Sequence, residues 1–342
     1  MGRQFKYYCI VMGVCCAFSF RIFAQAPILS QYFASPLSID PALAGNGYSS
    51  WRIMAVRRNQ WISAGVDPLN TTSLSLDGKL FKQKGNENNY LGAGFLIVQD
   101  KGLGGAYKNN SFNLAFSSHI SLDPEDTHSL AGGLGGSFNN TVIDYSQLSF
   151  SQQITSAGFN RNLPTFEPNL STVKPYSSVF GGVTYSYKTE AANFEMGLAC
   201  YQFLSSVRTS LQDPNQLDPP RFNFHTDFQS YLGERTTFNA NALFSFEKYI
   251  NTYSLGFNIG NMVGSTVEDE EPTIINTGIW YRHSQALSPY IGLGYGIMQV
   301  GISYDINISN SKTDLGPLQT FEFSLVFRSP VRIKSPVPCP WR

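Results

Sequence analysis

Hydrophobic and polar side chains alternate along many short stretches of this chain. In residues 320–328, T-F-E-F-S-L-V-F-R, three phenylalanines and a leucine share one parity, while Glu322 and Arg328 share the other. Successive side chains of a strand point to opposite faces. The stretch therefore predicts a strand with one apolar face and one charged face.

The same alternation recurs in residues 73–80, 111–120, 237–247 and 300–309. Charged side chains fall on the polar parity of their own strands, as the following set shows: Asp77, Lys79, Glu195, Asp227, Glu247, Asp305, Glu322 and Arg328. A charge that faces lipid at the bilayer midplane costs roughly 2–4 kcal/mol, whereas a lumenal charge does not. A soluble barrel would place its charges outside and its aromatics inside, so the number and length of strands must decide between the two classes.

A strand needs about 9–11 residues to cross a membrane, and stretches at least that long occur fourteen times. They lie at 51–62, 70–82, 89–100, 109–121, 128–141, 176–188, 193–206, 222–233, 236–249, 251–262, 272–283, 286–297, 299–309 and 318–328. Bacterial single-chain barrels have an even number of antiparallel strands. We therefore predict an all-β fold, a transmembrane antiparallel β-barrel of about fourteen strands over residues 51–328. Twelve or sixteen strands remain open.

The links between these strands alternate in length. If the N-terminus is periplasmic, the odd-numbered links face outward and are longer, as the fifth (142–176) and the seventh (206–221) are. Even-numbered links such as 123–126 and 189–192 are short. One even-numbered link, residues 264–272 with its run of four acidic residues, is long. It is either a functional periplasmic loop or a sign that the count slips by one strand there.

The N-terminal residues 1–25 have the pattern of a signal peptide. Arg3 and Lys6 form a positive region, an apolar region follows over 8–20, and Ala24-Gln25-Ala26 offers a cleavage site. No further apolar run of about 20 residues follows, so a helical membrane protein is not indicated. Beyond the signal the cysteines are Cys200 and Cys339, and nothing in the pattern supports a disulfide between them.

Residues 26–50 do not read as a strand. Pro36 and Pro41 remove backbone donors and Gly45 relaxes the chain, so the stretch favours turns or a short helix. Its aromatic and aliphatic side chains need somewhere to be buried. We expect it to form a plug inside the lumen or a cap over the periplasmic mouth.

Composition is consistent with one membrane unit. No linker divides the 342 residues, so a single unit is favoured. The net charge is zero, which argues against nucleic acid as a partner. The chain has 26 Phe and 18 Tyr but few charges, as lipid-facing bands and aromatic girdles require. After the last strand a Pro-rich tail covers residues 329–342.

No motif for catalysis, a cofactor or a metal is evident. The four histidines, His119, His128, His225 and His283, lack metal-ligand spacing, and a Ser–His–acid site in the lumen lacks a nucleophile motif. The acidic run at 268–271 lacks the Gly-punctuated spacing of a calcium loop, so a solvated turn is favoured. The glycine pairs near 92–94 and 132–136 are not followed by Lys-Ser/Thr and read as barrel glycines that permit curvature. We predict that the protein is not an enzyme.

Two motifs carry a resemblance to a known family. The opening S-Q-Y-F-x-x-P-L-x-x-x-P-A-x-A-G and the later R-x-N-Q-W contain the following matching residues: Ser30, Gln31, Tyr32, Pro36, Pro41, Ala42, Gly45, Arg58, Gln60 and Trp61. Together they resemble the opening of PorP/SprF proteins of the type IX secretion and gliding motility machinery of Bacteroidetes. Residues 301–307 and the closing strand 321–327 resemble later parts of the same family, whose members usually stop at that strand.

The resemblance implies a non-catalytic barrel in the cell outer membrane, in contact with its lipid, that docks other proteins. Such proteins tie the secretion motor to the membrane through a periplasmic peptidoglycan-binding protein, or retain a secreted adhesin through its C-terminal domain. The alternative is a porin-like channel for small solutes. The two differ in the lumen, because a plug over residues 31–46 contradicts free diffusion.

Overall fold

The computed structural model describes residues 29–62, 67–83, 86–156, 158–164, 173–206, 219–233, 235–248, 250–264, 273–283, 285–308 and 319–330. The expected signal peptide lies outside these residues, as do the acidic run 268–271 and most of the C-terminal tail. Among the described residues no helix is long and apolar enough to cross a membrane.

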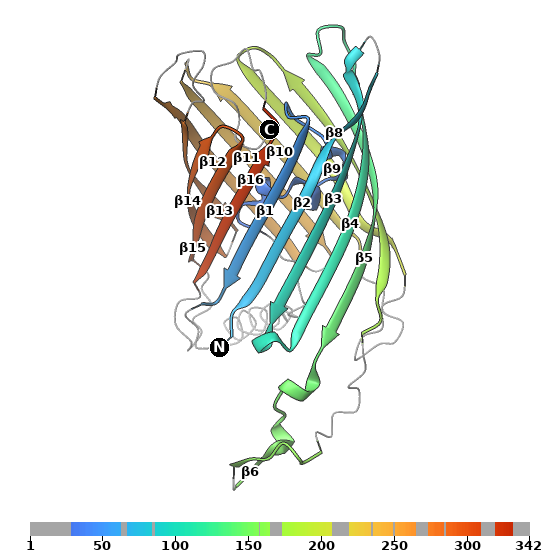
Figure 1. Ribbon diagram of the computed structural model, residues 1–342, viewed down its shortest axis with the longest axis vertical. Coiled ribbons are helices and arrows are strands. Elements are labelled where there is room, and N and C mark those ends of the chain that lie inside the picture. The colour runs from blue at the N-terminus through green and yellow to red at the C-terminus, as the bar shows by residue number, and fades with distance from the viewer. Residues whose placement is uncertain are drawn as a thin grey trace, which may run out of the picture.

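The fold is a closed antiparallel barrel of fourteen strands (Figure 1). The strands are β1 (Trp51–Gln60), β2 (Leu69–Gln83), β3 (Asn86–Gly102), β4 (Tyr107–Ser121), β5 (His128–Ile143), β8 (Tyr176–Lys188), β9 (Ala192–Ser205), β10 (Arg221–Tyr231), β11 (Thr236–Glu247), β12 (Ile250–Val263), β13 (Thr273–Arg282), β14 (Ala286–Tyr295), β15 (Met298–Asn307) and β16 (Thr320–Arg328). Each strand pairs with its neighbour along the chain, and β1 pairs with β16 to close the ring. The predicted strand count is confirmed.

Strand ends differ from the prediction by a few residues. The first strand was expected to reach residue 62 but ends at Gln60, because Trp61 adopts a left-handed backbone with φ 64°. β3 is longer than expected and continues to Gly102. Neither difference changes which face a side chain occupies.

The link β5–β8 is the most prominent connection. It contains the 3-10 turns η5 (Tyr145–Gln147) and η6 (Ser151–Gln153) and the small hairpin β6 (Ile154–Thr155) with β7 (Gly158–Phe159). It projects beyond the lower end of the barrel in Figure 1. We call this end, where the odd-numbered links lie, the long-link end, and the opposite end the short-link end.

Residues 264–272, most of which lie outside the described residues, connect β12 and β13. β12 and β13 are adjacent antiparallel partners, and the strand count continues regularly on both sides of them. The idea that the count slips by one strand at this link is therefore wrong. The link is an exception in length among the short connections.

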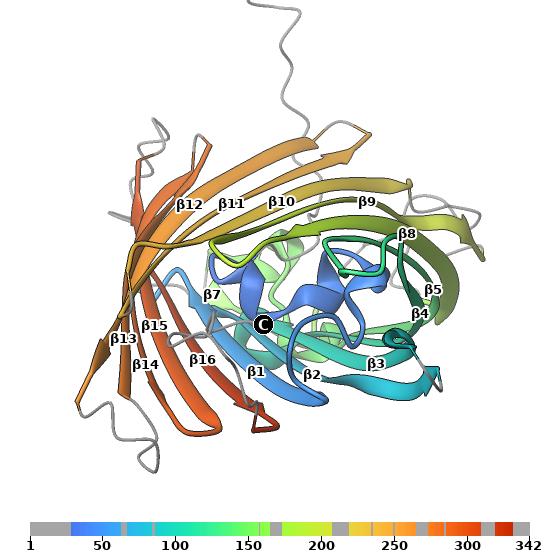
Figure 2. The same cartoon turned by 90° about the horizontal axis from the view of Figure 1, so that it is seen from above.

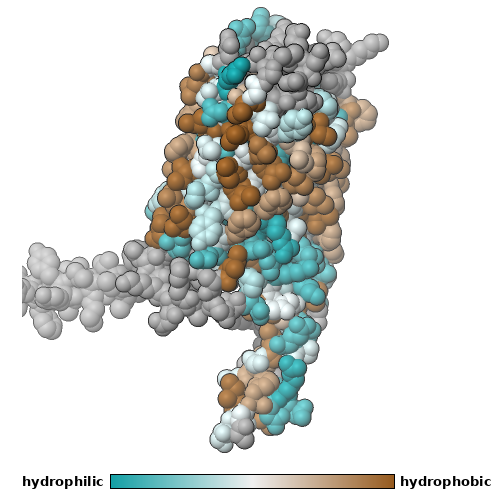
Figure 3. All heavy atoms as spheres, turned by 60° about the vertical axis from the view of Figure 1, so that its left-hand side comes forward, coloured by the Kyte–Doolittle hydropathy of each residue, from teal (hydrophilic) through white to brown (hydrophobic). Residues whose placement is uncertain are grey.

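Side chains are sorted between lumen and exterior as the alternation predicts. Inward-facing Asp77 and Glu322 are 2% and 0% exposed, whereas outward-facing Leu74 and Phe116 are 46% and 54% exposed. Figure 3 shows hydrophobic residues gathered on the outer wall of the face in view, with hydrophilic residues toward the projecting link. This is the reverse of a soluble barrel, so the membrane class is the one the fold supports.

Residues 29–50, which we call the N-terminal segment, precede β1 and lie inside the ring of strands (Figure 2). They form three single-turn 3-10 helices, η1 (Tyr32–Ala34), η2 (Pro36–Ser38) and η3 (Pro41–Leu43). Almost every side chain from 29 to 45 is buried. The segment therefore finds in the lumen the burial that its apolar side chains require.

Candidate functional site: the lumenal contacts of the N-terminal segment

The local conformation of the N-terminal segment follows from its prolines and its glycine. Pro36 and Pro41 each occupy the first position of a 3-10 turn, where a missing N–H costs nothing. Asp40 caps the third turn, because its Oδ1 accepts from Ala42 N at 2.7 Å. Gly45 has φ +67°, and a Cβ there would lie 2.8 Å from the carbonyl oxygen of Gly78.

A buried group of charged side chains meets the start of the segment near the long-link end. We call it the charge cluster, and it consists of Arg58 on β1, Arg282 on β13, Asp305 on β15 and Glu322 on β16. Arg58 lies 3.1 Å from Glu322 and 3.4 Å from Asp305, while Arg282 pairs with Asp305. Two positive and two negative groups balance, which is the condition under which charges tolerate burial.

The charge cluster binds the segment through backbone and side-chain groups of two residues. The backbone N–H groups of Ser30 and Gln31 donate to Glu322 Oε1 and Oε2 at 2.7 and 2.8 Å. The Ser30 hydroxyl donates to Asp305 Oδ1 at 2.7 Å. The Gln31 amide donates to Ser303 Oγ at 3.0 Å and accepts from Ser324 Oγ at 2.6 Å.

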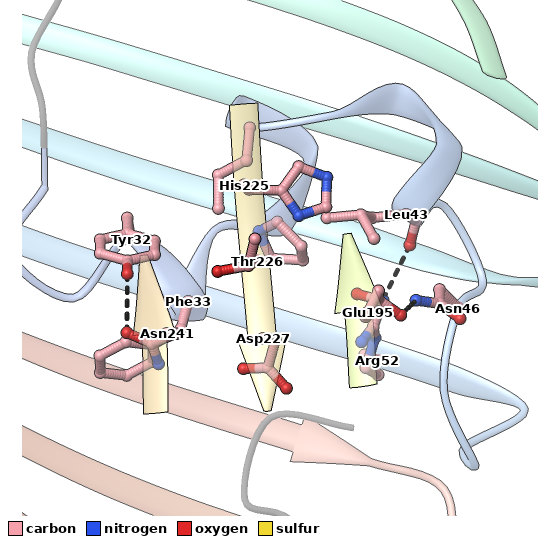
Figure 4. A pocket seen from close by; sticks show the side chains of 12 residues that line it. Tyr32, Phe33, Leu43, Asn46, Arg52, Glu195, His225, Thr226, Asp227 and Asn241 are labelled. Atoms are coloured by element: carbon pink, nitrogen blue, oxygen red, sulfur yellow. Dashed lines mark hydrogen bonds between the residues drawn. The ribbon is translucent and has the colours of Figure 1, made fainter. Parts of the chain in front are cut away.

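Aromatic side chains hold the first turn of the segment. The Phe33 ring lies 4.7 Å from that of Trp280 and 5.6 Å, edge-on, from that of Tyr290. The Tyr32 hydroxyl donates to Asn241 Oδ1 at 2.7 Å, an interaction drawn in Figure 4. Trp280 Nε1 donates to the same oxygen at 2.8 Å.

The middle of the segment contacts two of the histidines. His225 Nε2 lies 3.1 Å from Asp40 Oδ2, and Thr184 Oγ1 donates to that oxygen at 3.1 Å. His119 Nε2 lies 3.0 Å from the carbonyl oxygen of Ala44, to which the Ser117 hydroxyl donates at 2.7 Å. Both histidines are buried and face the lumen. Their ring nitrogens face the segment. The carboxylate of Asp40 contacts His225, whereas Ser117 and His119 contact each other and the carbonyl oxygen of Ala44, so these residues do not form one Ser–His–acid site.

The end of the segment contacts side chains near the short-link end. Arg52 pairs with Asp77 at 2.7 Å and donates to Leu43 O at 3.1 Å, while Gly45 N donates to Asp77 Oδ2 at 2.7 Å. Asn46 Nδ2 donates to Glu195 Oε2 at 2.6 Å, and Figure 4 shows this hydrogen bond beside that of Arg52 to Leu43 O. The segment thus runs lengthwise through the lumen, from the charge cluster to the short-link end.

Inward-facing glycines of the wall make room for the segment. A Cβ at Gly133 would collide with Ala42 N, one at Gly182 with the Asp40 carboxylate, and one at Gly92 with Ala44 O. Gly92 and Gly133 were expected to serve curvature. Close approach of a second backbone is the more specific reason that the structure gives.

Two of the family-motif residues lie apart from this network. Gln60 is the last residue of β1 and pairs with Leu69 and Thr320 in the sheet. Trp61 follows it and is 40% exposed. Seven of the other motif residues belong to the segment: Ser30, Gln31, Tyr32, Pro36, Pro41, Ala42 and Gly45. Arg58 on β1 pairs with Glu322, whose carboxylate accepts from the backbone of the segment.

Sequence reasoning missed Asp40, Trp280 and Arg282. Asp40 stands directly before Pro41, and an Asp-Pro pair is a recognisable start of a helical turn. Trp280 and Arg282 share a parity with buried Asn276 on β13, but a large aromatic on the polar parity reads as a break in the pattern. Its partner is the segment, which no strand pattern reveals.

Two cavities remain in the lumen beside the segment. The smaller, about 70 Å³, lies between the segment and β9–β11, and its lining is shown in Figure 4. The larger, about 220 Å³, lies toward the long-link end and is lined mainly by hydroxyl, amide and tyrosine side chains of β2–β5 and β8–β10. Within the described ranges no group of three His, Cys, Asp or Glu side chains could hold a metal ion.

A closed barrel with an apolar exterior and buried lumenal charges defines a β-barrel membrane protein. The sequence model of the type IX secretion system membrane protein PorP/SprF matches residues 22–327. The chain therefore belongs to the PorP/SprF family, as its opening motif predicts. No curated protein matches the chain.

Solved structures with a similar fold include the following three proteins, each of low sequence identity to this chain. The toluene transporter TbuX of Ralstonia pickettii has a TM-score of 0.50 at 8% identity, over 87% of this chain and 94% of its own. A FadL homologue of Pseudomonas aeruginosa has a TM-score of 0.48 at 9% identity, over 84% and 92%. The toluene transporter TodX of Pseudomonas putida has a TM-score of 0.47 at 9% identity, over 90% and 98%. At these identities the likeness to TbuX concerns the fold alone.

Proposed function

We propose that this protein is an outer-membrane component of the type IX secretion system that docks other proteins and does not conduct solutes. In this proposal residues 1–25 direct export, and the N-terminal segment is a plug. The observation that carries the proposal is the set of buried contacts along the segment, from Glu322 at one end to Glu195 at the other. These contacts hold the segment to the wall along its length, which is why we propose that it fills the lumen.

The two ends of the barrel suit two kinds of partner. The short-link end, taken as periplasmic, faces the peptidoglycan-binding protein through which the family connects to the secretion motor. The long-link end carries the projecting link β5–β8, with exposed Ile154 and Phe159, and suits a secreted protein retained by its C-terminal domain. Support for the proposal comes from the family and from this asymmetry of the links.

Deletion of residues 31–45 tests the plug. We expect the wild-type protein to be silent in planar bilayers and the deleted protein to insert, fold and conduct. Removal of residues 153–160 from the projecting link is the matched control, because it shortens the chain without touching the lumen. Retained heat-modifiable migration on gels shows that each barrel has folded. Large stable conductance from the wild-type protein would instead support the porin-like alternative.

Tagged purification from detergent-solubilised outer membranes, followed by mass spectrometry, tests docking. We expect a periplasmic peptidoglycan-binding or motor component, or one large secreted protein, to accompany the wild-type chain. If neither is recovered with either the wild-type or the link-deleted protein, docking is the wrong function. This outcome is independent of the conductance result.

A further inference from the structure

The outer wall of the barrel contains a hollow of about 810 Å³ where β3–β5 and β8–β10 pass side by side. Its rim is formed by large apolar side chains, Leu91, Phe116, Leu134, Val183, Leu198 and Phe222. Each of them is among the exposed hydrophobic residues of the lipid-facing surface. We call this feature the outer hollow.

The floor of the outer hollow is made of glycine. Gly132 on β5 is opposite Val183, and Gly133 is opposite Gly182 on β8. Gly132 has no left-handed backbone, and a Cβ added to it would meet nothing within 4 Å. A glycine inside a strand weakens the strand and often marks a place that a ligand approaches. Neither backbone conformation nor crowding within the chain accounts for Gly132.

The chemistry of the lining restricts what can occupy the hollow. No charged side chain contributes to it, and its polar side chains are those of Ser117, Ser118 and Cys200. Charged or strongly polar ligands would lose their hydration without replacement there. A hydrocarbon chain has no hydration of polar groups to lose, and its burial is favourable in proportion to the apolar area it covers.

We propose that the outer hollow binds an acyl chain of a phospholipid. The hollow is continuous with the apolar band that faces the bilayer, so a chain reaches it without crossing water. On β5 the glycines lie nearer the short-link end, where the strand begins at His128. The chain therefore comes from the leaflet on that side. That this leaflet is periplasmic, and hence phospholipid, rests on the orientation proposed above.

The floor of the hollow is also the wall against which the N-terminal segment lies. Gly133 and Gly182 leave no side chain between the hollow and residues Asp40 and Ala42. A single backbone layer therefore separates the bound chain from the segment. Occupancy of the hollow supports this part of the wall from outside.

Native mass spectrometry of the full-length protein in detergent tests the proposal, with palmitoyl-oleoyl phosphatidylethanolamine as the probe. We expect one retained lipid on the wild-type protein. Gly132→Leu fills the hollow, and we expect it to lower retention by about tenfold, a change in Kd that corresponds to about 1.4 kcal/mol. Gly136→Leu is the matched control, since Gly136 lies on the same strand and parity but outside the hollow.

A phosphatidylethanolamine with a photoreactive group on its acyl chain locates the site. We expect crosslinks on the peptides that contain Leu134, Val183 and Leu198. Equal retention by the Gly132→Leu and Gly136→Leu proteins, or crosslinks scattered evenly around the barrel, would overturn the proposal. Neither measurement depends on conductance or on partner capture, so the docking function is judged separately.

Discussion

At the scale of the residue, Glu322 connects the N-terminal segment to the ring of strands. Its carboxylate accepts from two backbone N–H groups of the N-terminal segment and pairs with Arg58, while its own strand closes the ring against β1. The side chain is fully buried. Loss of its charge therefore affects both the segment and the balance of the charge cluster.

Glu322→Gln keeps the shape of this side chain and removes its charge. We expect it to lower the free energy of unfolding by roughly 3 kcal/mol, because a buried arginine loses one of its two partners. Urea unfolding followed by gel migration measures the change. Glu190→Gln, on the exposed turn between β8 and β9, is the control and should have little effect. If both variants unfold alike, the cluster contributes no stability.

At the scale of the element, the N-terminal segment and the wall are complementary in shape rather than in sequence pattern. The segment offers short turns with few large side chains at Asp40 to Ala44, and the wall offers glycines opposite them. Such contact between backbones is sensitive to any added side chain. The fit therefore depends on these glycines, whose backbone conformation does not itself require glycine.

Gly133→Leu tests this fit, because the new side chain points inward against Ala42. We expect the segment to be displaced and the barrel to show channel openings in planar bilayers that the wild type lacks. Gly136→Leu, which points outward on the same strand, should remain silent. Silence of both variants, with both barrels folded, would show that the wall tolerates a side chain at this position.

Much of the barrel could be predicted from the sequence, and little of its interior could. The strand count and the lumenal side of charges such as Asp77 follow from a period of two, which is a local property. The pairing of Arg282 with Asp305 joins β13 and β15 past the strand between them, and that of Phe33 with Trp280 depends on where the N-terminal segment lies in the lumen. Alternation determines which face of its strand a side chain occupies but not which residue it contacts. These contacts could therefore be identified only in the structure.

At the scale of the whole molecule, the two ends of the barrel are distinct. Odd-numbered links include the projecting β5–β8 connection, whereas turns such as β8–β9 at the other end are short. Outer-membrane barrels place long links outside the cell and short turns in the periplasm. The proposed orientation, with the long-link end outside the cell, rests on this asymmetry and can be measured directly.

Single cysteines report the orientation in a background that carries both Cys200→Ala and Cys339→Ser. We expect Ser156→Cys, on the projecting link, to react with a membrane-impermeant maleimide in intact cells. Glu190→Cys, on the turn between β8 and β9, should react only after the outer membrane is permeabilised. Labelling of Glu190→Cys alone in intact cells would reverse the orientation and with it the leaflet assigned to the outer hollow.

The lengthwise course of the N-terminal segment constrains the order in which the molecule can be assembled. The segment is made before any strand, yet its first described residues bind β15 and β16, which are made last. A ring that has already closed offers a chain end only two narrow mouths through which to enter. The simplest order is that the curling sheet wraps around the segment, and that β16 seals the ring when Glu322 meets Ser30 and Gln31. The segment would then act as a template around which the barrel forms. Its loss would slow the pairing of β16 with β1 even where the finished barrel is stable.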